Sequence, residues 1–295
     1  MNSEMAYLLG LICGNGEVKR GPTNTIISID IPHKKLQTEL IDDVQIYVKA
    51  SVSDIRSILE PLIGAQLDFI QNPTSTILSF QKPNSDYLIR EIMRYIGHAT
   101  NHSNIRIHSD IFNFTTDHKI QFLRGFADVT GYIRRSNYFF EKHLHRVYLE
   151  VPNNWHLVID ICNLLHDIDI PVQNIDWAHP NMRDPKLVKY RANKPDFWKK
   201  EHQIKIWANE FLPVGFQVLH KMKMLEMYSN ELINGIKAGG KEASAYTHRY
   251  YWETRNQNVK KEEHPGIYDE VIPEEIRGIN FNTWKEIAES LGYPR

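Results

Sequence analysis

The alternation of apolar and polar residues divides the first hundred positions into helices and strands. Residues 4–14 are apolar on nearly every face, which predicts a buried helix, and Gly16 ends it. Residues 17–19 and 25–31 alternate or are β-branched on either side of a Gly-Pro turn, which predicts a hairpin. The remaining expected elements are a helix over 54–63 capped by Ser53, a weak strand near 67–71, a strand over 76–81 and a helix over 85–96.

The second part of the chain repeats this order. Its expected elements are a helix over 117–126 capped by Thr115 or Thr116, strands over 132–135 and 146–151, a helix over 155–167 capped by Asn154, a strand over 203–207 and a helix over 218–227. The segment 176–200 is polar and interrupted by prolines, so we expect a long irregular hairpin there. After Gly239-Gly240 the composition changes to mixed aromatic and charged residues.

Two short segments match each other directly. Residues 7–18 align with residues 122–133, so that Gly10 pairs with Gly125 and Gly16 with Gly131. A duplication of this size predicts two similar half-domains facing each other. The expected boundaries are 1–98 for the first domain, 99–232 for the second and 233–295 for a C-terminal extension that repeats neither. Because glycine has no side chain, we expect a close helix–helix interface at Gly10, Gly14 and Gly125.

Composition narrows the class of protein. A chain of 295 residues with 42% hydrophobic and 11% aromatic residues is typical of a folded globular protein. The net charge of −1 means that any basic surface is local. The two cysteines form no CxxC pair, which argues against a thiolate zinc site. No apolar run approaches the length of a membrane span and no signal-type start is present. These features predict an intracellular protein, in the cytoplasm or nucleoid, without membrane contact.

The paired segments resemble the LAGLIDADG motif of homing endonucleases. The matching residues are Leu8, Gly10, Leu11, Ile12 and Gly16 in the first copy and Leu123, Gly125, Phe126, Asp128 and Gly131 in the second. The run Val214-Gly215-Phe216, followed by Lys221 and Leu225, is similar to the closing helix of the second family domain. The resemblance covers residues 4–230. It implies an α+β fold of two pseudo-symmetric αββαββα domains, whose hairpins form a saddle in the major groove of double-stranded DNA.

The chain departs from the family where the chemistry is done. The residue before the last motif glycine is usually Asp or Glu in the family, and the two carboxylates bind a divalent metal. Here these residues are Asn15 and Thr130. Magnesium is a hard ion that prefers charged oxygen ligands, so we expect weak metal binding, with ligands unknown. Mg²⁺ is the cofactor only if the protein is active.

Four other residues are candidates for the same centre. Glu17 and Asp128 are the nearest carboxylates, although Asp128 points about 200° away from Thr130 on an ideal helix. The family also uses a basic residue near the metal, and Lys82 and Lys205 lie at loosely matching positions. The catalytic candidates are therefore Asn15, Thr130, Glu17, Asp128, Lys82 and Lys205.

Basic residues occur where the saddle would contact phosphates and base edges. The candidates for DNA binding are Lys19, Arg20, Arg134, Arg135, Lys142, Arg146, Lys186, Lys189 and Arg191. We interpret the chain as a sequence-specific double-stranded DNA-binding protein of this type, with cleavage lost or much reduced. Two alternatives remain open: an active metal-dependent site-specific endonuclease, and an intron RNA-splicing cofactor. The extension 233–295 is a candidate surface for a protein partner.

Overall fold

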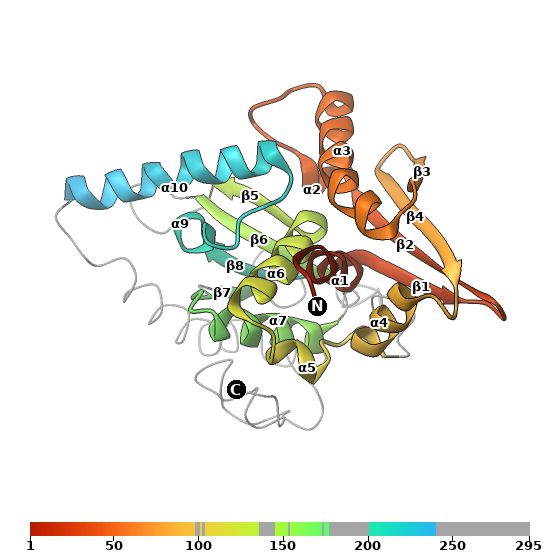
Figure 1. The fold of residues 1–295 in the computed structure, drawn as a ribbon. Helices are drawn as coiled ribbons and strands as arrows, with labels where there is room; N and C mark the ends of the chain where they lie inside the picture. Colours follow the sequence, from red (N-terminus) through yellow and green to blue (C-terminus); the bar gives the residue numbers. More distant parts are fainter. Residues whose placement is uncertain are drawn as a thin grey trace, which may run out of the picture.

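The computed structural model describes residues 1–97, 101, 104–135, 145–152, 154–172, 174–176 and 201–239. Over these residues the fold is α+β, as expected, with two four-stranded antiparallel sheets and helices packed against them (Figure 1). The expected irregular hairpin and most of the C-terminal extension lie outside the described residues.

The first half contains one sheet with strand order β1-β2-β4-β3. Its elements are α1 (Ser3–Asn15), β1 (Gly16–Arg20), β2 (Asn24–Pro32), α2 (His33–Leu36), α3 (Val44–Ile63), β3 (Asp68–Gln71), β4 (Ser75–Pro83) and α4 (Tyr87–Ile96). Burial alternates along β2 and β4, as expected for strands with one face on the core.

The second half has the same strand order, β5-β6-β8-β7. Its elements are α5 (Ser109–Phe112), α6 (Thr116–Thr130), β5 (Gly131–Arg135), β6 (His145–Pro152), α7 (Trp155–Asp167), β7 (Asn174–Asp176), β8 (Glu201–Trp207), α9 (Ala208–Phe211) and α10 (Leu219–Gly239). Helix α10 runs past residue 232, where the extension was expected to begin.

Three helices, α3, α6 and α10, are longer than the sequence pattern predicts. Helix α3 begins at Val44, ten residues before the expected start, because Asp43 accepts hydrogen bonds from the Gln45 and Ile46 amides and forms the cap. The expected cap, Ser53, lies inside this helix. Helix α6 continues to Thr130 instead of ending at residue 126.

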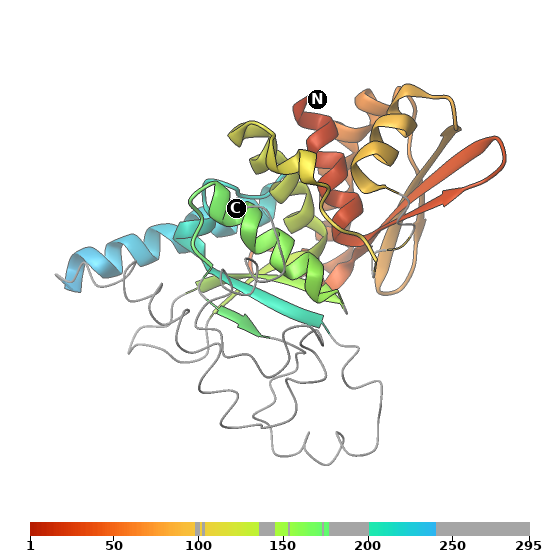
Figure 2. The same cartoon turned by 90° about the horizontal axis from the view of Figure 1, so that it is seen from below.

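The core of the molecule centres on α1 and α6, which pack side by side between the two sheets (Figure 1; Figure 2 shows α1 running from the N-terminus toward the strands). Ten consecutive residues of α1, from Met5 to Gly14, are buried. The segment before α5 is tied to the second half, because Arg106 donates two hydrogen bonds to the buried Asp160 of α7 at 2.8 and 3.2 Å. A buried carboxylate with a bidentate arginine fixes geometry well.

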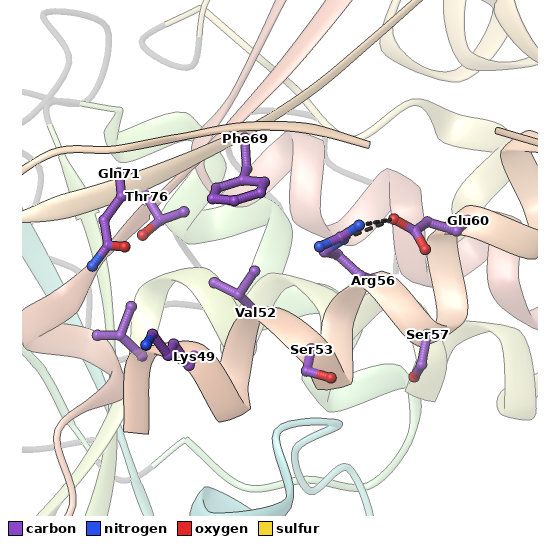
Figure 3. A pocket seen from close by; sticks show the side chains of 10 residues that line it. Lys49, Val52, Ser53, Arg56, Ser57, Glu60, Phe69, Gln71 and Thr76 are labelled. Carbon is purple, nitrogen blue, oxygen red and sulfur yellow. Dashed lines mark hydrogen bonds and ion pairs between the residues drawn. The ribbon is translucent and has the colours of Figure 1, made fainter. Parts of the chain in front are cut away.

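Helix α3 packs beside the edge strand β3 and leaves a hollow of about 390 Å³ between them (Figure 3). The ring of Phe69 lies over Val52 and the Arg56 guanidinium, which is 5.7 Å from the ring centroid. Arg56 Nη2 is 2.6 Å from the Glu60 carboxylate, so these two charges neutralise each other, and Lys49 also lines the hollow. The hollow is on the helical side of the sheet and takes no part in the site described below.

Candidate nucleic-acid interface

The two motif helices meet at glycines. A Cβ atom at Gly10 would lie 1.9 Å from the Phe122 carbonyl oxygen, and one at Gly125 would lie 2.1 Å from the Tyr7 carbonyl oxygen. A Cβ at Gly14 would be 2.5 Å from Val129 Cγ2. Both backbones thus approach to a distance that excludes any side chain. Gly10 faces Phe122 and Gly14, one turn later, faces Val129, so the two helices run parallel and end together.

The last residues of the two helices are held by internal hydrogen bonds. Asn15 Nδ2 donates to the Asp30 carbonyl oxygen at 2.8 Å. The Thr130 hydroxyl donates to the Phe126 carbonyl oxygen at 2.7 Å, one turn back along its own helix, and Thr130 is buried. Neither side chain carries a charge, and both already bind backbone. These residues do not fit a site for a divalent cation, which needs charged oxygen ligands.

Asp128 points into the protein and away from the helix ends. Its carboxylate accepts a hydrogen bond from the Tyr7 hydroxyl of α1 at 2.7 Å and from the Gln217 amide at 3.1 Å. Burial raises its pKa, against the opposing effects of Lys221 and these hydrogen bonds. This placement gives Asp128 a structural part: it links the two motif helices and the start of α10.

Lys221 lies beside this carboxylate and is also fully buried. Its Nζ donates to the carbonyl oxygens of Ala127, Asp128 and Gly131 at 3.2, 3.1 and 2.8 Å. These carbonyls belong to the end of α6 and the start of β5, where helices leave acceptors unsatisfied. Burial lowers the pKa of Lys221 to about 8. The lysine that matched the family's closing helix thus caps the second motif helix.

Glu17 lies on the solvent-facing side of β1. Its carboxylate is 2.8 Å from Lys19 Nζ, and the Lys19 and Glu17 side chains are 66% and 45% exposed. Val18, between them, is buried on the opposite face. Glu17 is therefore on the sheet face that a duplex could reach, already paired with a cation.

The two basic catalytic candidates occupy different places. Lys82 is the strand partner of Thr25, and Thr25 is the strand partner of Arg20. Lys82 therefore lies beside the turn end of the β1–β2 hairpin, far from Gly16. Its Nζ is 3.4 Å from Asp86. Lys205 faces Tyr148, one row from the motif glycine Gly131, and its Nζ is 5.5 Å from that ring's centroid. The structure brings Lys205, and not Lys82, near the end of a motif helix.

The basic residues proposed to bind DNA divide into three groups. Lys19, Arg20, Arg134 and Arg135 are exposed on β1 and β5. Arg146 is only 5% exposed, and its guanidinium carbon lies 4.2 Å from the Trp207 ring centroid. This placement favours a structural contact with Trp207 over a contact with DNA. The other four, Lys142, Lys186, Lys189 and Arg191, lie outside the described residues.

A charged cluster at the seam between the halves was not expected from the sequence. Lys35 Nζ donates to Glu150 Oε2, Lys34 Nζ is 3.6 Å from the same oxygen, and the Tyr132 hydroxyl donates to Glu150 Oε1 at 2.9 Å. A hollow of about 380 Å³ adjoins these side chains. Glu150 follows Leu149, the strand partner of Gly131, and Asp30 follows Ile29, the strand partner of Gly16, so each carboxylate comes one residue past the row where its motif helix ends. No local sequence signal could have predicted this charged cluster, because it depends on pairing between distant strands.

Neither a metal-binding cluster nor a membrane-spanning helix occurs among the described residues. Within that part of the chain, no three His, Cys, Asp or Glu side chains come together in a group that could hold a metal ion. Nor does it contain a helix long and apolar enough to cross a membrane.

Comparisons with known proteins give structural matches alone. No protein-family model and no curated protein matches the chain. A variant of I-DmoI in complex with its target DNA is 13% identical over 71% of this chain and 91% of that chain, with a TM-score of 0.41. I-DmoI in complex with DNA and Mn is 13% identical over 75% and 96%, with a TM-score of 0.38. The LAGLIDADG meganuclease I-CpaMI bound to uncleaved DNA is 9% identical over 85% and 97%, with a TM-score of 0.40. At this low identity, the chain is similar to LAGLIDADG homing endonucleases of known structure.

Proposed function

We propose that the chain is a sequence-specific double-stranded DNA-binding protein of the LAGLIDADG type whose cleavage activity is lost or much reduced. The observation that carries this proposal is the pair of parallel motif helices that end together in Asn15 and Thr130. Both side chains are neutral and both are engaged by backbone groups. The motif resemblance supplies the DNA-binding part of the proposal, and the missing carboxylates supply the loss of cleavage.

The arrangement of the strands supports duplex binding. Each motif helix leads directly into an antiparallel hairpin, β1–β2 or β5–β6, and a β-ribbon fits the major groove. Arg20 and Arg135 are exposed near the ends of β1 and β5, where each strand is farthest from the helices. Cations at the ends of a ribbon suit contacts with the phosphates that border the groove.

Binding is tested by selecting duplexes from a random pool with the full chain at low salt. A sequence motif should be enriched, and affinity for it should fall steeply as salt rises. A pool that stays random after several rounds would overturn the DNA-binding proposal. A parallel competition with structured RNA tests the splicing alternative, which predicts that RNA displaces the selected duplex.

Cleavage is tested on the selected duplex with magnesium or manganese, read on a denaturing gel. The wild type should leave the duplex intact. The double variant Asn15→Asp and Thr130→Asp restores two carboxylates at the helix ends, so it should bind the metal more tightly and cut more than the wild type. Thr74→Asp with Asn230→Asp, which adds two carboxylates at exposed positions outside the motif helices, is the control for altered charge. Efficient cutting by the wild type that Glu17→Gln abolishes would show an active enzyme with displaced ligands.

A further inference from the structure

The exposed face of the first sheet presents its side chains in regular rows. Val18, Ile27 and Leu78 point to the core, so the residues next to them in sequence point outward. The register places four outward residues in one row across β1, β2, β4 and β3: Glu17, Ser28, Ser79 and Asp68. The neighbouring rows are Lys19, Ile26 and Gln81 on one side and Asp30, Ile77 and Ile70 on the other.

The outward face of the first sheet carries more negative than positive side chains, which does not suit binding to phosphates. Its carboxylates are Glu17, Asp30 and Asp68, whereas its cation is Lys19, and Lys19 is 2.8 Å from the Glu17 carboxylate. The residues between them are hydroxyls, an amide and aliphatic side chains, of which Ile26 is 39% exposed. A surface that contacts DNA mainly through the backbone carries an excess of lysine and arginine. The first sheet therefore offers acceptors and apolar groups at its centre.

The dimensions of the rows match those of a duplex. Strands about 4.8 Å apart make the four-residue row span about 14 Å, close to the major groove width of about 12 Å. Successive rows are two residues apart, or about 6.8 Å along a strand, which is about two base-pair steps. Glu17 and Asp68 lie at the two ends of one row, three strand spacings or about 14 Å apart, so they reach different base pairs. In the major groove a carboxylate accepts a hydrogen bond from the amino group of cytosine, N4, the contact that suits Asp and Glu.

We propose that Glu17 and Asp68 determine sequence specificity by reading cytosine amino groups in the half of the target that lies under the first sheet. This inference rests on the proposed function and concerns the first sheet. The first sheet reads base edges with acceptors, and Arg20 at its end holds phosphate. Lys19, next to Glu17, is placed to donate to the guanine of a G·C pair, whose O6 and N7 are acceptors.

The test compares base preferences of full-length variants by duplex selection and by binding to duplexes with single base changes. Wild type should enrich a G·C pair at two positions of one half-site. Asp68→Asn should lose the preference for cytosine at one of them, about 5- to 150-fold, and keep it elsewhere. Glu17→Gln should do the same at the other position. Neither variant should lower the salt dependence, whereas Arg20→Gln should reduce the slope of log affinity against log salt by about 0.9. Glu226→Gln, exposed on α10, is the matched control and should change nothing.

The outcomes separate this inference from the proposed function. If wild type enriches no motif, the proposed function fails. If wild type enriches a motif but Asp68→Asn and Glu17→Gln leave every base preference unchanged, the reading role is wrong. If both variants bind all duplexes more tightly by the same factor, the carboxylates only repel the backbone, which also overturns it.

Discussion

At the scale of single residues, Gly10 and Gly125 each have the backbone of the other motif helix, and not a flexible side chain, opposite them. A methyl group at Gly10 or Gly125 would meet a carbonyl oxygen of the other helix at about 2 Å. Gly10→Ala and Gly125→Ala should therefore each lower the free energy of unfolding by about 1–3 kcal/mol or more, because the helices must move apart. Denaturant titration measures this. Gly21→Ala, in the β1–β2 turn, is the control, and equal stability of all three variants would contradict the packing.

Lys221 is the second residue whose replacement should have a large effect. It is fully buried, binds three carbonyl oxygens and lies beside the Asp128 carboxylate. Lys221→Met would leave those acceptors and a buried charge without a cation, so we expect a loss of about 3–5 kcal/mol in unfolding free energy. The matched control is Lys223→Met, two residues along α10 and exposed. A loss no larger than that of the control would mean that Lys221 is not a cap for α6.

At the scale of elements, hydrophobic periodicity predicts the strands and most helices because one face of each is buried. Helix α7 follows the expected bounds, and Asn154 caps it because its Oδ1 accepts a hydrogen bond from the Leu157 amide. The start of α3 could not be predicted, since Val44 and Ile46 are exposed and break the apolar stripe. The motif ends were visible in the sequence. Their neighbours Asp30 and Glu150 were not, because strand register depends on pairing between distant segments.

The strand β8 carries a buried histidine that makes stability depend on pH. Burial lowers the pKa of His202 to about 4, below the ordinary value near 6.5. Between these values the unfolded chain binds a proton that the folded chain does not, so stability falls as pH falls from 6.5 to 4. The full loss is about 3 kcal/mol. Unfolding free energies of wild type and His202→Leu across this range should differ in slope, with the variant less sensitive to acid. Parallel curves would show that His202 is not buried in its neutral form.

At the scale of the whole molecule, near-zero net charge conceals local groups of like charge. The outward face of the first sheet carries Glu17, Asp30 and Asp68, while β1 and β5 each end in two exposed basic residues, Lys19-Arg20 and Arg134-Arg135. Replacing both arginines with glutamine should weaken duplex binding and lower the salt slope by about 1.8, without a change in thermal stability. Arg90→Gln, exposed on α4, is the control. An unchanged slope would remove the second hairpin from the phosphate contacts.

The parallel packing of α1 and α6 has an electrostatic consequence. Each helix carries a dipole whose C-terminal end bears about half an elementary negative charge, and parallel helices bring two such ends together. Lys221 offsets this charge at the end of α6. At the end of α1, the described cap is the Gly16 amide, which donates to the Ile12 carbonyl. If the proposed function holds, a duplex lying across both sheets would meet the negative ends of both helix dipoles at the seam, whichever neutral side chains occupy the last motif positions.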